Sequence, residues 1–566
     1  MRQRFVGQLA CAFVLCLQVG LASSAVFNVT TTTDGGPGSL RQAVIDANTA
    51  AGPDTINVPA GTYVLGIPGA GEDAAATGDL DITDSVTING AGSGVTTISA
   101  GGGFADRIFH VTSAGATVSI NGVTITGGSP GGSASGGGIL NAGVLTLSDV
   151  VVAQNAAGIQ GGGIASTGTL TLTNSVVRNN TALQGGGVHT AAFTATDCTI
   201  RNNTTSNASA GGLFVLGPFT ISRCTISNNT AGGGNQGGGM FVLLASGTLT
   251  NVTIANNTAG SGGGIFNNPP ATPPENVIRL VNSTVAFNIS GGLRSFGTRN
   301  FSILNTLLAS NSGSDCPNTD IVSEGFNLIT NTSTCTISGV TTGNILNVGA
   351  GIGSLANNGG PTETIGLNAG SPAIDAATAA GAPPTDQRGV PRPVGTAFDI
   401  GAFEGTLGGG GGPLPALSIN NVTAGEGNAG ATNFTFTVTL SAASAQTVTV
   451  NFATSDGTAN AASDYNPTSG QLTFAPGQTS QPIVVTVVGD TAPEPNETFF
   501  VNLSNAVNAT IAATQGAGTI TNDDASAPPP PPPPADIPTL SEWALACLTI
   551  LLAGMTALTL RRRRYR

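Results

Sequence analysis

Residues 169–182 read TLTLTNSVVRNNTA, and residues 195–205 read ATDCTIRNNTT. In both stretches apolar and polar residues alternate and an Asn pair follows, which predicts short β-strands that end in a turn. One segment of this kind cannot bury its apolar face, whereas a stack of segments buries that face between its members. The repeat therefore predicts a parallel β-helix with one coil per segment.

The repeat also predicts which side chains share a place on successive coils. Glycine clusters open the segments at intervals of 24 to 29 residues. These clusters begin at Gly136, Gly161, Gly185, Gly211, Gly237, Gly262 and Gly291. An inward aliphatic ladder is expected at Val152, Val177, Ile200, Ile226, Ile254, Val285 and Leu308. Three residues later, a structural ladder of hydrogen-bonded asparagines is expected at Asn155, Asn180, Asn203, Asn229, Asn257, Asn288 and Asn311.

Two residue pairs also fall at equivalent places on neighbouring coils. Cys198 and Cys224 should face inward, either as a disulfide or as stacked free thiols. Asp197 and Arg223 should face outward and form a surface ion pair worth about 0–1 kcal/mol.

Length and composition restrict the class of protein. The 566 residues exceed what a single compact core holds unless a repeat stacks. The 83 glycines show no G-X-Y period, which excludes collagen. A hydrophobic fraction of 40% with only 8% charged residues argues against a wholly disordered chain. The net charge of -13 predicts that the protein repels nucleic acid, and no nucleic-acid partner is expected.

The sequence around the repeat divides the chain into further segments. A basic start and an apolar run predict a cleaved signal peptide, and Ser39 to Gln42 fit the start of a short helix that caps the β-helix. The predicted segments are 1–25 signal peptide, 26–53 cap, 54–345 β-helix of about a dozen coils, 346–404 end module, 405–413 glycine-rich linker, 414–524 β-sandwich, 525–536 proline-rich spacer and 537–566 C-terminal signal.

Two of these segments resemble known modules of exported bacterial proteins. Residues 346–404 contain NNGGPTETIGLNAGSPAID, TDQRGVPRP and FDIGAFE, and resemble the choice-of-anchor module found after surface β-helices. Residues 414–524 contain AGEGNAG, TSDGTANAASDY, GDTAPEPNETFFVNLSN and GTITNDD in that order, and resemble the Calx-beta domain. The resemblance implies an antiparallel β-sandwich.

In Calx-beta domains that bind Ca²⁺, loop carboxylates converge at one end. The matching residues here are Glu426, Asp456, Asp490, Glu494, Glu497, Asp523 and Asp524. Oxygen ligands suit this hard cation. The loop after Asp490 reads Thr-Ala-Pro where strong calcium sensors carry acids, so weak affinity of about 10⁻⁴–10⁻³ M is expected. The alternative is that these acids only shape turns.

The C-terminus combines a short motif, an apolar stretch and an arginine cluster. The apolar stretch, 544–560, is at the short limit for a transmembrane helix. The order resembles the IPTL-type sorting signals of Gram-negative bacteria, which exosortase-like membrane proteases read. The motif residues are Ile537, Pro538, Thr539, Leu540 and Trp543. The resemblance implies a cell-surface or extracellular protein whose tail is cut off; the alternative is a permanent membrane anchor.

The cysteines are consistent with export. Cys316 and Cys335 enclose a loop of 18 residues, and a disulfide between them is expected in an oxidising compartment. The predicted fold class is thus all-β: a right-handed parallel β-helix, then a Calx-beta sandwich, with a C-terminal transmembrane helix.

Function is harder to predict than architecture. Glycoside hydrolysis usually needs two carboxylates about 5–9.5 Å apart. The regular coils offer few acids, chiefly Asp149 and Asp197, and the earlier coils carry a patch from Asp79 to Asp84. No catalytic residue is assigned. A non-enzymatic structural or adhesive protein that contacts polysaccharide or matrix is expected; the alternatives are a polysaccharide lyase or hydrolase and a passive spacer.

Overall fold

The computed structural model describes residues 24–269, 276–297, 300–405, 415–442, 444, 447–475, 477–507, 509–524 and 544–553. The signal peptide before residue 24, most of the linker, the proline-rich spacer and the motif residues Ile537 to Leu540 and Trp543 lie outside them.

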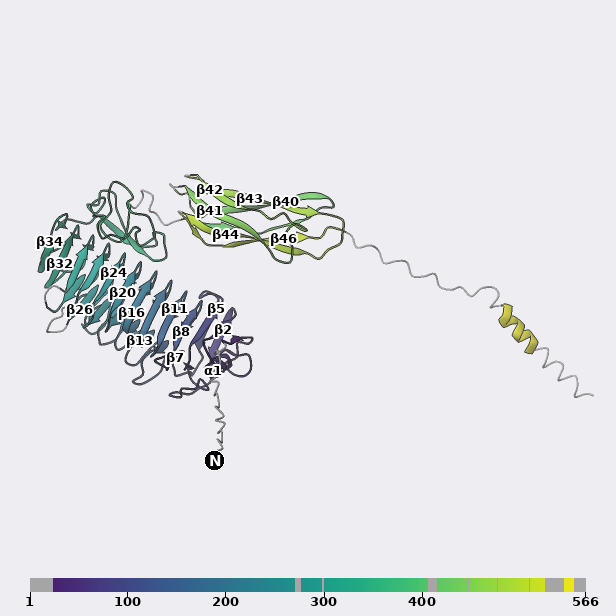
Figure 1. Ribbon diagram of the computed structural model, residues 1–566, viewed down its shortest axis with the longest axis horizontal. Coiled ribbons are helices and arrows are strands. Elements are labelled where there is room, and N and C mark those ends of the chain that lie inside the picture. The colour runs from purple at the N-terminus through teal and green to yellow at the C-terminus, as the bar shows by residue number, and fades with distance from the viewer. Residues whose placement is uncertain are drawn as a thin grey trace, which may run out of the picture.

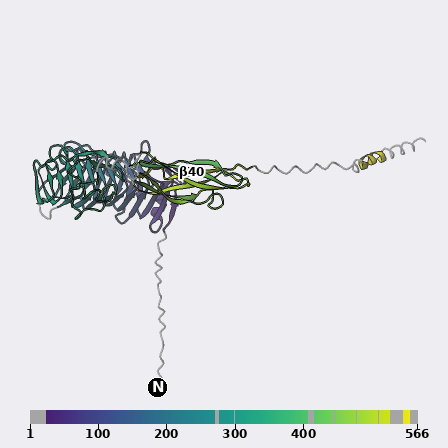
Figure 2. The same cartoon turned by 90° about the horizontal axis from the view of Figure 1, so that it is seen from above.

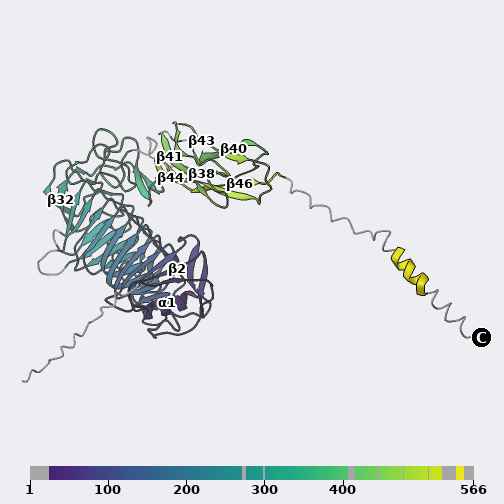
Figure 3. The same ribbon diagram turned by 45° about the vertical axis from the view of Figure 1, so that its right-hand side comes forward.

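The first part of the chain is a stack of parallel coils that runs from the helix α1 (Leu40–Thr49) to the last strand of the largest sheet (Figure 1). Viewed from above and after a 45° turn, the coils keep a common axis (Figures 2 and 3). One side of the stack is a twelve-stranded sheet of β3 (Gly61–Leu65), β6 (Thr96–Ala100), β9 (Thr124–Thr126), β12 (Val151–Ala153), β14 (Val176–Arg178), β17 (Thr199–Arg201), β21 (Thr225–Ser227), β25 (Thr253–Ala255), β28 (Thr284–Ala286), β31 (Leu307–Ala309), β33 (Leu328–Ile329) and β35 (Ile345–Leu346).

A twenty-stranded sheet forms the rest of the wall, and most coils contribute two strands to it. Its strands are β1 (Val26–Asn28), β2 (Asp54–Val58), β4 (Leu80–Ile82), β5 (Val86–Gly90), β7 (Phe109–Val111), β8 (Thr117–Asn121), β10 (Ile139–Asn141), β11 (Val144–Ser148), β13 (Ile164–Thr173), β16 (Val188–Thr196), β19 (Leu213–Val215), β20 (Phe219–Ser222), β23 (Met240–Leu243), β24 (Gly247–Thr250), β26 (Ile265–Asn268), β27 (Ile278–Val281), β29 (Leu293–Ser295), β30 (Phe301–Leu304), β32 (Thr319–Gly325) and β34 (Cys335–Val340). A small third sheet holds β15 (Thr181–Ala182), β18 (Thr204–Thr205) and β22 (Thr230–Ala231).

The expected ladders are confirmed by the strand register. Val177 pairs with Ile200 and Ile200 with Ile226, and all three side chains are buried. In each Asn pair the first residue adopts the left-handed backbone conformation that Asn tolerates, as at Asn228 with φ 56°. The second residue is buried, and its amide donates to the next coil: Asn229 Nδ2 lies 3.0 Å from Asn257 Oδ1.

Helix α1 closes the N-terminal end of the stack. Ser39 accepts a hydrogen bond from the backbone N–H of Gln42 at 3.1 Å, which is the N-cap that the sequence predicts. The Gln42 side chain does not complete a capping box but donates to Asp46 at 2.8 Å. Leu40, Ala43 and Val44 on the helix join the core of the coils.

The end module packs against the outer face of the twelve-stranded sheet. It contains a hairpin of β36 (Ile352–Ala356) and β37 (Thr364–Leu367) and long loops up to residue 405. Its Ile365, Ile400 and Phe403 share a core with side chains of β28 and β31. Arg392 and Glu404 form a fully buried ion pair, and Arg388 pairs with Asp386 while lying 3.6 Å above the Phe403 ring. Buried side chains of the TDQRGVPRP and FDIGAFE motifs thus fill the interior of this module.

The third unit is an antiparallel β-sandwich with its own core. One sheet holds β38 (Ala416–Ile419), β40 (Gly430–Leu440), β43 (Ser480–Gly489) and β45 (Thr510–Ile511). The other holds β39 (Val422–Gly425), β41 (Val448–Asp456), β42 (Ser469–Phe474), β44 (Glu497–Val507) and β46 (Gln515–Thr521). Buried aromatic rings of Phe434, Phe436, Tyr465 and Phe499 fill the space between the sheets.

The predicted C-terminal transmembrane helix is wrong for the residues that the structure describes. Among them, no helix is long and apolar enough to cross a membrane. The predicted apolar stretch, 544–560, is at the short limit for a span, and only its residues 544–553 are among those described.

Candidate functional site

The acidic residues of the sandwich gather at one end because of the strand directions. β39 and β46 run parallel, so the residues that follow them, Glu426 and Asp523–Asp524, emerge at the same edge. β44 runs antiparallel to β46, so Glu494 and Glu497 at its beginning lie at that edge too. We call this region the sandwich tip.

The structure brings the tip acids together in two groups. In each group, one ligand atom per residue lies within 4.8 Å of the others: Glu426, Asp523 and Asp524 in one, and Asp464, Glu494 and Glu497 in the other. Five of the seven acids that the sequence singles out therefore sit where a cation can bind. Asp464 was missed, although it belongs to the quoted SDY triplet; only the fold places it beside Glu497.

The other two predicted ligands have local roles. Asp456 accepts hydrogen bonds from the Tyr465 hydroxyl at 2.7 Å and from the Ala461 backbone at 2.9 Å. Asp490 accepts one from the Ala492 backbone at 2.7 Å, although its charge still acts on Glu426. Asp456 is thus a turn residue, as the alternative interpretation expected for the whole set.

Electrostatics at the tip favour a cation. Burial, followed by the charges of Glu494, Asp490, Asp524 and Asp523, raises the pKa of Glu426. Burial, followed by a hydrogen bond and charge repulsion from Asp464, raises the pKa of Glu497 to about 6. Asp524 Oδ2 is buried and has no hydrogen-bond partner among the described residues. An orphaned carboxylate oxygen among mutually repelling acids fits a hard divalent cation such as Ca²⁺.

A further cluster of ionisable side chains lies on the first coils of the β-helix, around the patch from Asp79 to Asp84. His110 Nδ1 is 3.0 Å from buried Asp81 and 3.6 Å from exposed Asp73. Burial, followed by the charges of Asp81 and Asp106, raises the pKa of Asp79 to about 7. Asp79 is buried, however, and bonded to Arg107 at 2.8 Å.

The acids of the regular coils have partners. Asp149 accepts hydrogen bonds from Ser93, the shorter at 2.9 Å. Arg223 Nε and Nη2 donate to the two carboxylate oxygens of Asp197 at 2.7 and 2.6 Å, so the predicted ion pair is present and bidentate. Both carboxylates are therefore engaged in hydrogen bonds within the described coils.

The cysteines divide as follows. The structure joins Cys316 and Cys335 by a disulfide near the end of the stack. Cys198 and Cys224 are buried free thiols, and the Cys198 backbone N–H lies 3.3 Å from Cys224 Sγ. The alternative of stacked thiols is therefore the one observed.

Comparison with known proteins identifies two parts of the chain. Residues 421–525 are a Calx-beta domain. The IPTL-CTERM motif matches residues 537–564 and marks an exported protein that is processed at the surface.

The relatives of the Calx-beta domain share only this part. Dog sodium/calcium exchanger 1 is 46% identical over 70 residues, which cover 12% of this chain and 7% of the exchanger. Human sodium/calcium exchanger 3 is 42% identical over 59 residues, or 10% of this chain and 6% of that protein. The chain thus spans less than a tenth of the length of these curated relatives.

Two solved structures are similar to this chain to a limited degree. The apo form of the Calx CBD1 domain is 25% identical and covers 20% of this chain and 99% of its own, with a TM-score of 0.18. The enzymatically active domain of tailspike protein 2 of bacteriophage CBA120 is 10% identical and covers 86% of this chain and 74% of its own, with a TM-score of 0.25.

Proposed function

We propose that this exported protein is a non-enzymatic adhesin that contacts glycan or matrix polymers along the β-helix. The observation that carries the proposal is a regular array of hydroxyl groups on the outer face of the twenty-stranded sheet. One row pairs in register on five successive coils: Thr146, Thr171, Thr194, Thr220 and Thr248. A second row beside it holds Ser148, Thr173, Thr196, Ser222 and Thr250.

Such an array suits a ligand that repeats as the coils do. Strands in a sheet lie about 4.8 Å apart, so the same pair of hydroxyls recurs at this interval. Each hydrogen bond to a sugar hydroxyl contributes little, because water competes for it. Several contacts to one polymer act together, since the first fixes the effective concentration of the next.

Ca²⁺ at the sandwich tip is part of the proposal. Glu426, Asp523 and Asp524, together with Asp464, Glu494 and Glu497, would hold the ion and supply it with carboxylate oxygens. Bound Ca²⁺ would neutralise the repulsion at the tip and stiffen the loops there. We further propose that an exosortase-like protease processes the C-terminal signal.

The second candidate function is a polysaccharide lyase or hydrolase with its site on the first coils. The raised pKa of Asp79, to about 7, is the observation that favours it, because a general acid must be protonated near neutral pH. Its burial and its bond to Arg107 count against it, since a catalytic acid must reach the substrate. A passive spacer is the third possibility.

The test is co-elution of the protein with neutral and acidic polysaccharides on a size-exclusion column, with and without Ca²⁺. We expect at least one polymer to elute with the protein. Thr194→Glu with Thr220→Glu places two charges in the exposed part of the row and should abolish that co-elution. Thr204→Glu, an exposed threonine of β18 on another face, is the matched control. Failure of every polymer to bind would contradict the proposed function.

A further inference from the structure

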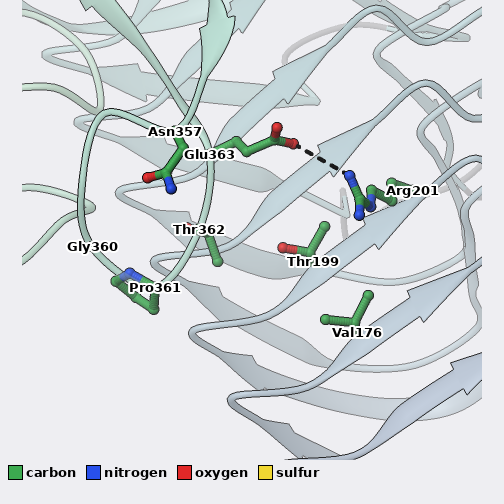
Figure 4. A pocket seen from close by; sticks show the side chains of 8 residues that line it. All are labelled: Val176, Thr199, Arg201, Asn357, Gly360, Pro361, Thr362 and Glu363. Atoms are coloured by element: carbon green, nitrogen blue, oxygen red, sulfur yellow. Dashed lines mark ion pairs between the residues drawn. The ribbon is translucent and has the colours of Figure 1, made fainter. Parts of the chain in front are cut away.

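A pocket lies between the twelve-stranded sheet and the end module. Strands β14 and β17 supply one wall through Val176, Thr199 and Arg201, and the loop of residues 357–363 supplies the other (Figure 4). The pocket has a volume of about 240 Å³. Figure 4 shows the Arg201 guanidinium and the Glu363 carboxylate facing each other at its edge.

Arg201 at this pocket and Arg178 on the adjacent coil differ from the other arginines that the structure describes. Each of the others donates at least one hydrogen bond to a carboxylate or carbonyl oxygen. These are Arg41, Arg107, Arg223, Arg279, Arg294, Arg388 and Arg392. Arg201 has only Glu363 at 3.9 Å, and its buried Nε has no partner among the described residues.

Arg178 adds a second positive charge beside Arg201. The two arginines pair in register on adjacent coils, so their backbones are about 4.8 Å apart. Within the described part of the chain, Arg178 makes no ion pair or side-chain hydrogen bond. Two neighbouring arginines, with one carboxylate 3.9 Å from Arg201, are a local excess of positive charge on a protein of net charge -13.

The opposite wall is fixed before any ligand arrives. The buried Gln387 side chain donates to the Thr362 hydroxyl at 2.9 Å and to the Glu363 carbonyl at 3.2 Å, and accepts from Thr253 of the sheet at 2.6 Å. Thr225 of β21 also donates to the Glu363 carbonyl at 2.5 Å. A wall held by the sheet itself loses little freedom on binding, which favours recognition of a small group.

We propose that this pocket binds the carboxylate of a uronic acid unit in an acidic polysaccharide. Arg201, with Arg178 beside it, would hold the carboxylate, for which the planar guanidinium is well suited. Thr199 and the amide of Asn357 can bond to sugar hydroxyls, and Pro361 and Val176 offer apolar surface to the ring. The proposal rests on the proposed function as a glycan-binding protein and assigns one ligand class to a site apart from the threonine rows.

The test uses an oligomer of galacturonic acid and its carboxyl-reduced neutral counterpart of the same length, measured by isothermal titration calorimetry at low salt. We expect the wild-type protein to bind the acidic oligomer at least tenfold more tightly than the neutral one. Arg178→Gln with Arg201→Gln should remove this preference. Glu363→Gln should strengthen binding of the acidic oligomer, because it removes the competing carboxylate.

Arg279→Gln is the matched control, because it removes one charge from another face at a similar exposure, 38% against 40% for Arg201. Thermal unfolding of each variant shows whether it is folded. Acidic binding that survives in the double variant, or equal binding of both oligomers, would overturn the pocket and leave the adhesin proposal standing. If the wild type binds neither oligomer, the pocket proposal is also wrong, and co-elution of other polymers decides on the adhesin.

Discussion

The asparagine ladder of the β-helix and the acidic tip of the sandwich differ in whether their buried polar groups have hydrogen-bond partners. In the ladder, Asn229 Oδ1 accepts from both the backbone N–H and the side-chain amide of Asn203 at 3.0 Å. At the tip, Asp524 Oδ2 is buried without a hydrogen-bond partner among the described residues, and burial together with the neighbouring carboxylates raises the pKa of Glu426. Polar groups that the chain pairs with itself build the fold, whereas those that it leaves unpaired are available to a ligand.

A substitution in the asparagine ladder should lower the free energy of unfolding more than any other substitution that we propose. Asn229→Ala removes the acceptor of the Asn203 backbone N–H and of one Asn203 amide hydrogen, while the Asn203 amide keeps its bond to the Val177 carbonyl. It also removes the amide that donates to the Ile200 carbonyl and to Asn257 Oδ1, so several buried polar groups lose a partner. At about 1–3 kcal/mol for each unsatisfied group, we expect the free energy of unfolding to fall by about 3–5 kcal/mol, measured by denaturant titration. Asn228→Gly at the exposed neighbour, whose φ of 56° glycine accepts, should change it by less than about 1 kcal/mol. Equal effects would show that the ladder is not special.

The buried His189 should make the stability of the β-helix depend on pH. Its buried ring stacks on Phe214, with centroids 4.8 Å apart, and burial lowers its pKa to about 4. The neutral form is therefore favoured in the fold, so its contribution is complete above pH 6.5 and is lost as the pH falls toward 4. His189→Phe should remove this loss, up to about 3 kcal/mol between pH 6.5 and 4. Parallel pH curves of unfolding for the variant and the wild type would contradict the assignment.

The stability of the sandwich tip should depend on bound Ca²⁺. We expect millimolar Ca²⁺ to raise the unfolding temperature of the sandwich in differential scanning calorimetry, because the ion binds the folded state. Asp464→Asn should lower the affinity about tenfold or more, since Asp464 belongs to a ligand group. Asp456→Asn, at the residue that bonds to Tyr465, is the control and should leave the calcium effect intact. If Asp456→Asn weakened calcium binding and Asp464→Asn did not, Asp456 would be a ligand, as the sequence predicts, and Asp464 would not.

The smallest effect is expected where a polar pair lies at the surface. Asp197 and Arg223 meet at 2.6 Å but are 22% and 37% exposed, so solvent screens their attraction. Asp197→Asn should change the free energy of unfolding by about 0–1 kcal/mol. A loss of 2 kcal/mol or more would show that the pair acts as a buried one.

The sequence predicts the fold well where a repeat is present. Val177, Ile200 and Ile226 lie in register because the period of each segment is visible in the chain and every coil obeys the same rule. The sequence predicts the acidic end of the sandwich less completely. Asp456 and Asp464 stand in one quoted motif, and only the path of the loop decides that Asp464 faces Glu497.

Long-range contacts explain what the sequence could not predict. The pocket at Arg201 needs Glu363, which is 162 residues away in the chain, and Gln387 to hold the wall. No local pattern connects these residues. The transmembrane prediction rested on an apolar stretch of marginal length, 544–560, and no helix among the described residues is long and apolar enough to cross a membrane.

The most direct test of the central claim is the chain length of a polysaccharide after contact with the protein. A polymer that co-elutes with the protein is incubated with excess protein, with and without Ca²⁺, and its size distribution and reducing ends are then measured. The account predicts an unchanged length and no new reducing ends, because the protein binds the polymer without cleaving it. Shortened chains would contradict it, and their loss in Asp79→Asn would place an enzyme on the first coils.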